Sequence, residues 1–338
     1  MECKQIVFTE KNKAELLTVE VNEPAENEVL VETAFSTISC GTERANITGD
    51  PNVSAGNSYG CVFPRYLGYN CAGVVVKKGS GVKSVEIGDR VVVYWSCHKQ
   101  YNLVPEQQVV KIPDGVSFET GAISFISTFP MAAIRKTRLE IGESAMVMGL
   151  GILGMLAVKL LRAAGAVPIV AADPNPARRE IALKNGADYA FDPLADEFAE
   201  KVKEVTGGGV KAAIEVTGVG AGFNEILDCM AKFGRVALLG CTRSSDFTVD
   251  YYGKIHAPGI TVIGAHTNAR PETESHPGWF THRDDISAVL NLCKSGRICL
   301  ENLVEETHTP EECPEVYNRL VNDKKFPVVV QFDWRHMK

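Results

Sequence analysis

The sequence predicts an α/β protein in which a doubly wound parallel sheet is accompanied by a second, barrel-like β domain. Three observations support this prediction. Residues 145–173 read as strand, glycine turn, helix and strand; strand-like and helical runs alternate from there to residue 295; and extended apolar runs fill the first 38 residues and recur at 327–332. A chain of 338 residues suits two domains.

The glycine turn follows the apolar run 145–148 and opens a helix. Its three glycines permit a tight turn, close approach of backbone N–H groups to a pyrophosphate, and close packing of helix on strand. The second strand, 167–172, ends on an acid about 20 residues after the last glycine, as the motif requires. The residues predicted to bind a dinucleotide here are Gly149, Gly151, Ile152, Leu153, Gly154 and Asp173.

The acid at the end of the second strand also predicts which dinucleotide is bound. A carboxylate at Asp173 accepts hydrogen bonds from the ribose hydroxyls and repels a 2′-phosphate. No basic residue stands next to it at Pro174. We therefore predict NAD in preference to NADP.

Composition restricts the partners and the location. With 45% hydrophobic and 23% charged residues the chain has the composition of a soluble globular protein, and its net charge of −7 disfavours nucleic acid or an anionic membrane as partner. Residues 1–30 carry charges throughout, and no apolar stretch reaches the ~18 residues of a membrane span. We expect a cytoplasmic protein that acts on a small molecule.

The ten cysteines point to the same compartment. None of them forms a CxxC pair, which disfavours both a redox motif and a closely spaced metal site. We expect reduced and mostly buried thiols.

The first part of the chain predicts an antiparallel, barrel-like domain. Short apolar strands fill 3–21 and 28–38, and strand signals resume at 73–76 between glycine turns. Residues 39–70, which include the polar segment 49–60, are rich in Gly, Asn, Ser and Pro. We expect this segment to be irregular and either functional or mobile.

The second half of the chain alternates between strand-like and helical runs, which is typical of a doubly wound parallel sheet. Strand-like runs occupy 212–216, 235–239 and 260–263, and helical runs occupy 177–185, 198–206, 223–233 and 284–295. The final strand-like runs lie around Leu303 and at 327–332.

Four motifs carry a resemblance to a known family: ISCGTE at 38–43, LGYNCAGVV at 67–75, GSGVKSVEIGDRVVV at 79–93 and GLGILG at 149–154. Over essentially its whole length the chain resembles the medium-chain dehydrogenase/reductase superfamily. The resemblance implies a GroES-like catalytic domain at 1–123 and 298–338, and a Rossmann NAD-binding domain at 124–297. It also implies a substrate site in the cleft between the two domains, and a homodimer or homotetramer.

The zinc ligands of the family are altered in this sequence. The resemblance places Cys40 at the cysteine ligand, Tyr69 where a histidine is usual, and Phe125 at the third ligand, whereas a catalytic zinc needs about three protein ligands. The four cysteines of the structural zinc lobe are reduced to Cys97. We predict no zinc of either kind; the alternative is a rearranged site built from Cys40, Cys71, Cys97 or His98.

Without zinc, the oxygen of the substrate needs a protein acid/base group. Tyr69 is the first candidate, because a phenol can donate to a carbonyl or, when deprotonated, accept from an alcohol. His98 is the second, because an imidazole titrates near neutrality; the alternative is a surface-loop histidine. Thr42 occupies the position of the hydroxyl that relays the alcohol proton in the family, while Ala45 replaces the histidine that often continues this relay.

The resemblance also implies a substrate pocket and further cofactor contacts. The pocket candidates are Cys40, Glu43, Asn70, Trp95, Phe125 and His266, and the further cofactor candidates are Arg178, Thr217, Gly240 and Cys241. Alternatives remain open for several of these. Glu43 and Arg44 can be structural charges, Trp95 plain core, and the strand-end positions ordinary turns.

The sequence therefore predicts a zinc-independent, NAD-dependent oxidoreductase that transfers hydride between the nicotinamide and a secondary alcohol or ketone. A polyol, sugar or cyclitol is the expected substrate, from likeness to sorbitol- and threonine-dehydrogenase-like members and from the polar groups Glu43, Asn70 and His98. The alternatives are an enone or quinone reductase of the same superfamily, and an NAD-binding protein without catalytic activity.

Overall fold

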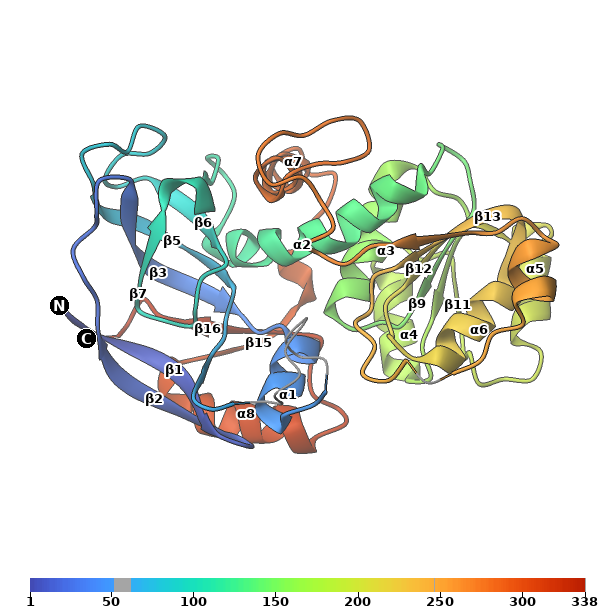
Figure 1. Ribbon diagram of the computed structural model, residues 1–338, viewed down its shortest axis with the longest axis horizontal. Helices are drawn as coiled ribbons and strands as arrows, with labels where there is room; N and C mark the ends of the chain where they lie inside the picture. The colour runs from blue at the N-terminus through green and yellow to red at the C-terminus, as the bar shows by residue number, and fades with distance from the viewer. Residues whose placement is uncertain (52–61, 246, 338) are drawn as a thin grey trace. The chain divides into compact units, whose positions relative to one another are not determined.

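The computed structural model describes residues 1–51, 62–245 and 247–337. By its internal contacts the chain divides into two compact units (Figure 1). The first unit comprises Met1–Ile126 and His282–Lys338, and the second comprises Ser127–Thr281. Each unit is described separately below.

The first unit is built on two β-sheets. A seven-stranded sheet has the order β15-β16-β3-β5-β6-β8, with β7 paired to β3, and a three-stranded sheet has the order β2-β1-β4. Every pairing is antiparallel except β15 with β16, in agreement with the prediction of an antiparallel domain. The strands are β1 (Glu2–Glu10), β2 (Lys13–Glu20), β3 (Glu28–Thr37), β4 (Arg65–Tyr66), β5 (Asn70–Lys78), β6 (Arg90–Tyr94), β7 (Tyr101–Pro105), β8 (Val109–Lys111), β15 (Val304–His308) and β16 (Val329–Asp333).

The end of the chain completes the first sheet. Strand β16 pairs with β3, so that the red C-terminal segment lies beside the blue N-terminal one in Figure 1. Helix α8 (Cys313–Asn322) packs its apolar face into the same core, where Tyr317 meets Phe8 edge-on at 4.8 Å between ring centroids. The two ends of the sequence thus share one hydrophobic core.

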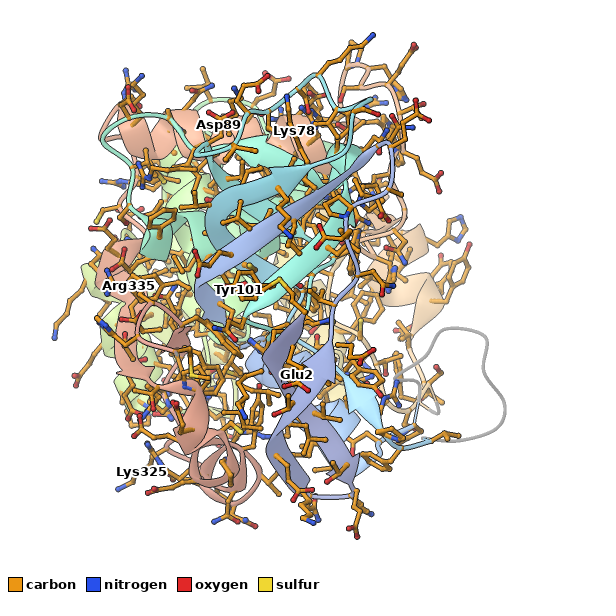
Figure 2. All side chains as sticks on the ribbon, turned by 90° about the vertical axis from the view of Figure 1, so that its left-hand side faces the viewer. Glu2, Lys78, Asp89, Tyr101, Lys325 and Arg335 are labelled. Carbon is orange, nitrogen blue, oxygen red and sulfur yellow. The ribbon has the colours of Figure 1, made fainter. Side chains whose placement is uncertain are left out.

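Charged side chains cover the outer faces of the first unit. Figure 2 shows Lys78 and Asp89 at the same end of the sheet, where β5 turns into β6. There Lys78 pairs with Glu86 at 2.7 Å, and Asp89 pairs with Lys111 at 2.6 Å. Because Glu86 and Lys111 are mostly exposed, each pair adds little to stability.

Two helices of the first half of the chain differ from expectation. The segment 39–70 was expected to be irregular, but residues Cys40–Thr48 form helix α1, which ends on Gly49 at φ +71°. Its apolar residues are too few for a clear helical pattern in the sequence. Packing of α1 on α8 stabilises the helix instead. The part of the polar segment at 52–61 lies outside the described residues. Helix α2 (Phe118–Thr137) was not predicted.

The second unit holds one six-stranded parallel sheet with the order β11-β10-β9-β12-β13-β14, which confirms the predicted doubly wound fold. Its strands are β9 (Ala145–Met148), β10 (Ile169–Ala172), β11 (Tyr189–Phe191), β12 (Val210–Glu215), β13 (Met230–Leu238) and β14 (Thr261–Gly264). The strand order reverses between β9 and β12. This reversal is where ligands bind in open α/β sheets.

The helices that connect these strands are α3 (Ile152–Ala164), α4 (Pro176–Lys184), α5 (Phe198–Thr206) and α6 (Gly220–Cys229), and α7 (His282–Lys294) follows in the first unit. The helix predicted at 223–233 ends at Cys229, because Met230 already pairs with Val210 as the start of β13. Short helical turns lie at η1 (Glu106–Gln108), η2 (Tyr252–His256), η3 (Glu301–Leu303) and η4 (Pro310–Glu312).

Helix α7 is grouped with the first unit because it packs against β8, where Arg283 donates to the carbonyl of Val109 at 2.9 Å. The contact-based units therefore divide at 126/127 and 281/282. The predicted domain boundaries at 123/124 and 297/298 rest on the family resemblance and stay a prediction. Among the described residues, no helix has both the length and the apolar character needed to cross a membrane.

Candidate functional site

The phenol of Tyr69 lies just before strand β5 and donates to the hydroxyl of Ser39 at 2.5 Å. Ser39 is the N-cap residue of α1, but its side chain makes no capping hydrogen bond to its own helix. A serine at this position usually caps the helix, because its oxygen accepts an N–H of the first turn. Here the hydroxyl is used for Tyr69 instead.

The backbone before Tyr69 is held close to His98. Gly68 adopts φ +104°, and a Cβ at this position would lie 2.3 Å from both Cγ and N of His98. The N–H of His98 donates to the carbonyl of Leu67 at 2.7 Å, and Ser96 donates to that of Gly68 at 3.0 Å. Glycine is therefore required at 68 for both conformation and space.

A buried carboxylate, Glu43, connects α1 to this backbone. It accepts from the N–H of Ser39 at 2.8 Å, from the phenol of Tyr317 at 2.5 Å and from Nε2 of His98 at 3.1 Å. Burial first, and then the Glu43 carboxylate, raise the pKa of Tyr317 well above its usual range, so this phenol stays a donor. Glu43 thus pairs with these groups instead of with Arg44, which donates to the carbonyl of Leu320.

His98 is wholly buried at the centre of this network. Its Nδ1 lies 2.7 Å from the hydroxyl of Ser36, which also accepts from the indole of Trp334 at 2.8 Å. Nε2 can donate to the Glu43 carboxylate while Nδ1 accepts from the Ser36 hydroxyl, so each ring nitrogen has a partner. The alternative of a surface-loop histidine is wrong, and both ring nitrogens are occupied by protein groups.

The remaining candidates near α1 have different surroundings. The thiol of Cys40 lies 3.6 Å from the carbonyl oxygen of Val328 and 3.8 Å from that of Pro327, just before β16. Thr42 is half-buried in the first turn of α1. Asn70 is buried and donates to the carbonyl of Thr37 at 3.4 Å, while its Oδ1 has no hydrogen-bond partner within the described part of the chain.

An aromatic cluster, formed by Tyr69, Tyr94, Trp95, Phe125 and His282, adjoins the Tyr69 phenol. The ring of Phe125 is fully buried at its centre, 5.0 Å from Trp95, 5.7 Å from Tyr69 and 4.9 Å from His282. Trp95 is 39% exposed and adopts φ +57°, which is rare for so bulky a residue. Such strained backbone gathers at functional sites.

The three residues at the family's zinc-ligand positions contact other groups of the protein. Tyr69 is engaged with Ser39, Phe125 offers only a ring, and Cys40 faces backbone carbonyls. Cys71 is buried, and its burial raises the pKa of the thiol to about 12. In the residues that the structure describes, no group of three or more His, Cys, Asp or Glu side chains is arranged to hold a metal ion; Cys61 lies outside them.

In the second unit, the predicted glycine turn leads from β9 into α3. Gly149 adopts φ +96°, and Gly154 packs so closely on it that a Cβ at 154 would lie 1.9 Å from the Gly149 carbonyl oxygen. Gly151 is the N-cap of α3 and has no side chain to satisfy the first-turn N–H groups, which include those of Ile152 and Leu153. These donors and the helix dipole fit a pyrophosphate.

The carboxylate of Asp173 closes this turn. It accepts from the N–H of Leu150 and from that of Asn175, each at 2.8 Å, and it is 5% exposed. Two oxygens offer about four acceptor positions, so two remain for ribose hydroxyls. Arg178 lies 3.8 Å from the carboxylate, and Arg179 donates to the carbonyl of Asp173 at 2.7 Å.

Three turns meet at the reversal of strand order. A Cβ at Gly149 would lie 2.9 Å from Cγ2 of Thr217, and one at Gly240 would lie 2.4 Å from the N of Gly218. A Cβ at Gly218 would in turn lie 2.6 Å from the carbonyl oxygen of Cys241. The structure thus brings together Gly149, Thr217, Gly240 and Cys241 at one edge of the sheet. His266 follows the edge strand β14, and its Nδ1 accepts from the N–H of Asn268 at 3.2 Å.

Several residues of these sites were not singled out from the sequence. They are Ser36, Ser39, Gly68, Tyr94, Arg179, Glu215, His282, Tyr317 and Trp334. Glu215 is buried at the end of β12, where burial raises the pKa of its carboxyl, and it accepts from the N–H of Thr217 at 2.7 Å. An acid that ends an apolar strand three residues before a glycine is a signal that sequence reading can use.

Two family models match the chain and together cover more than half of it. The model described as alcohol dehydrogenase GroES-like domain matches residues 25–114, and that described as zinc-binding dehydrogenase matches residues 153–277. The chain belongs to the zinc-type medium-chain alcohol and polyol dehydrogenase superfamily. This membership confirms the resemblance drawn from the four sequence motifs.

Among curated relatives, L-threonine 3-dehydrogenase of Pyrococcus horikoshii is 28% identical, with 86% of this chain and 87% of the relative covered. D-guloside 3-dehydrogenase of Escherichia coli K12 is 24% identical, with 94% and 96% covered. The crystal structure of 2R,3R-butanediol dehydrogenase from Bacillus subtilis superimposes with a TM-score of 0.80 at 24% identity, covering 98% of this chain and 99% of the other.

These relatives and neighbours are named dehydrogenases, which confirms the prediction of a dehydrogenase at the level of the family. Solved structures of the same fold carry NADH in one case and NADP in another. The family is therefore NAD(P)-dependent.

Proposed function

We propose that this protein is a zinc-independent, NAD-dependent dehydrogenase that interconverts a secondary alcohol and its ketone. The observation that carries the proposal is the Tyr69 phenol, which lies within an aromatic cluster that includes the partly exposed Trp95. The family resemblance places Tyr69 where a zinc-binding histidine is usual. A nicotinamide cofactor held by the second unit would supply or accept the hydride. Residues of the chain bind the cofactor, contact the substrate and transfer the proton.

The second unit holds the cofactor. The first-turn N–H groups of α3 would bind the pyrophosphate, and Gly151, where a Cβ would meet no atom within 4 Å, leaves room for it. The remaining acceptor positions of Asp173 bind the ribose hydroxyls, which favours NAD, because a 2′-phosphate would be repelled by this carboxylate. Arg178 lies close enough to Asp173 to accompany the adenosine half.

The first unit supplies the acid/base group. In ketone reduction, Tyr69 donates the proton of its phenol to the carbonyl oxygen of the substrate; in alcohol oxidation, its phenolate takes up the proton of the alcohol. The buried His98 holds the backbone of Tyr69 and has no free ring nitrogen for the substrate. Thr42 and Asn70 are proposed to contact the polar groups of the substrate.

We propose a polyol, sugar or cyclitol as the substrate. The flat, partly exposed indole of Trp95 suits the C–H face of a sugar or cyclitol ring. The amide of Asn70, which follows Tyr69 in the chain and leaves its Oδ1 without a partner among the described residues, suits a hydroxyl. Relatives named D-guloside 3-dehydrogenase and sorbitol dehydrogenase support this class. We also propose that the protein is cytoplasmic and forms a homodimer or homotetramer.

Absorbance of NADH, recorded with a panel of polyols, cyclitols, sugar derivatives, ketones and enones, tests the reaction. We expect turnover with a cyclic or polyhydroxylated secondary alcohol and higher kcat/KM with NAD than with NADP. Preferential reduction of enones with NADPH identifies an enone or quinone reductase instead. Cofactor binding without turnover on any of these compounds identifies a binding protein.

Two further measurements test the mechanism. Elemental analysis is expected to find less than stoichiometric zinc, and a chelator is expected to leave turnover intact; one tightly held zinc per chain, with activity lost to the chelator, contradicts the proposal. Tyr69→Phe is expected to lower kcat at least about 100-fold. The matched control is Tyr101→Phe, which removes a phenol that donates to Glu32 on the outer face of the sheet.

A further inference from the structure

The hydroxyl of Ser39 is placed to act on Tyr69 and not on its own helix. Ser39 is the N-cap residue of α1 and is 4% exposed. Its hydroxyl makes no capping hydrogen bond and accepts a hydrogen bond from the phenol of Tyr69 at 2.5 Å. A serine hydroxyl can both donate and accept, and its hydrogen rotates to suit its partner. The same oxygen can therefore serve Tyr69 in either protonation state.

We infer that Ser39 is a positioning residue that stabilises the phenolate of Tyr69 by reversing the hydrogen bond between them. The inference rests on the proposed acid/base role of Tyr69. In the structure the phenol donates to Ser39. When the phenol hydrogen turns to the substrate oxygen, the serine hydroxyl turns to donate to the phenol oxygen, and it keeps this hydrogen bond once the proton has left. A hydrogen bond to an ionised acceptor is roughly twice as strong as one between neutral groups.

The proton and electron balance of the step is complete. In ketone reduction, the O–H bond of Tyr69 breaks and a new O–H bond forms on the substrate oxygen. The carbonyl carbon gains the hydride that the proposed function assigns to the reduced nicotinamide. No covalent bond of Ser39 changes, because its hydrogen only turns toward the phenolate. After the product leaves, Tyr69 regains a proton from water.

The buried network holds both partners of this hydrogen bond in place. On one side, Glu43 accepts from the N–H of Ser39, and its own N–H donates to the Ser39 carbonyl at 2.8 Å. On the other side, a Cβ at Gly68 would overlap His98, and the backbone N–H of His98 donates to the carbonyl of Leu67. These two contacts hold the backbone that leads into Tyr69. Because Glu43 and His98 contact each other at 3.1 Å, the two sides belong to one hydrogen-bond network.

The test compares Ser39→Ala with Ser39→Thr and Ser39→Cys. The alanine variant lacks the donor for the phenolate, so kcat for alcohol oxidation at neutral pH should fall about 10- to 100-fold with KM little changed. The midpoint of its pH–rate profile should rise by about one pH unit. Threonine restores the hydroxyl and should restore the midpoint; the cysteine variant, with a weak S–H donor, should fall between. Ser144→Ala, which removes a buried hydroxyl in the second unit, is the matched control.

A second readout does not depend on turnover. The ultraviolet absorbance of phenolate, taken as the difference between the protein and its Tyr69→Phe variant, isolates Tyr69 among the nine tyrosines. Its midpoint should rise in Ser39→Ala and return in Ser39→Thr. If Tyr69→Phe lowers kcat while Ser39→Ala keeps both midpoints, the inference about Ser39 is overturned and the proposed function stands. If Tyr69→Phe turns over like the unmodified protein, the acid/base assignment fails, and the inference fails with it.

Discussion

The imidazole of His98 and the carboxylate of Glu43 meet at 3.1 Å, although 55 residues separate them in the chain. Both side chains are wholly buried, and Tyr317 and the Ser39 N–H complete the surroundings of the carboxylate. A buried carboxylate is costly unless its acceptor positions are filled. Here the N–H of nearby Ser39 and two groups far away in the sequence, His98 and Tyr317, fill them. The pair joins α1 to the backbone that leads into Tyr69.

The first prediction concerns this carboxylate. Glu43→Ala removes the acceptor for Tyr317, His98 and the Ser39 N–H, so the free energy of unfolding should fall by about 3–5 kcal/mol. Denaturant unfolding measures it. Glu10→Ala is the control, since its side chain is 73% exposed and should leave stability nearly unchanged. A loss at Glu43 no larger than that at Glu10 contradicts the assigned role.

The second prediction compares two glycines with similar backbone angles. Gly68 has φ +104° with His98 in the way of a Cβ, whereas Gly88 has φ +94° with no atom within 4 Å of that position. Gly88→Ala should cost only the backbone strain, about 1–2 kcal/mol. Gly68→Ala adds the overlap with His98 and should cost about 3 kcal/mol or more. Equal losses in a thermal or denaturant experiment speak against the close approach of Gly68 to His98.

The third prediction separates cofactor binding from folding at the glycine turn. A Cβ at Gly151 meets no atom within 4 Å, so Gly151→Ala should leave stability unchanged but weaken NADH binding at least about 10-fold, because the pyrophosphate needs this space. Gly154→Ala overlaps the Gly149 carbonyl and should damage both. Fluorescence titration with NADH and denaturant unfolding give the two quantities. Unchanged NADH affinity in Gly151→Ala places the pyrophosphate elsewhere.

The fourth prediction concerns pH and the surface group of His308, Glu306 and Arg319. Burial lowers the pKa of His308, but its hydrogen bonds to Glu306 and Glu312 outweigh this and leave the pKa raised. A raised pKa means that this histidine stabilises the fold below its unfolded pKa, about 6.5, and that this contribution is lost as pH rises through the folded value. His308→Gln should therefore cost more stability at pH ~5.5 than at pH ~8.5.

Glu306 in the same group has the opposite dependence. Its hydrogen bond with Arg319 is the main cause that lowers its pKa to about 2. Its contribution is present above the unfolded value of 4.5 and is lost as pH falls toward 2. Unfolding of Glu306→Gln, measured beside the unmodified protein from pH ~7 to pH ~3, should show a difference that shrinks in acid. A difference that is constant over this range is the contrary result.

The sequence by itself determined the cofactor half of this protein. The glycine turn, the two flanking strands and Asp173 are contiguous in the chain, and their chemistry depends on local backbone conformation and on the order of elements. The family motifs, which are also local, indicated the superfamily. Helix α1 was missed, because its apolar pattern is weak and its stability comes from packing on α8.

The tertiary structure decided what surrounds Tyr69. The Ser39 hydroxyl, the Gly68 contact with His98 and the Tyr317 phenol on Glu43 join residues that lie 30 to 274 positions apart. No local pattern encodes such contacts, because they arise only when α1, α8 and the strand ends pack into one core. Burial there surrounds His98 with Ser36 and Glu43 instead of solvent, and it brings the Ser39 hydroxyl to Tyr69, a contact that the position of Ser39 before a helix does not suggest.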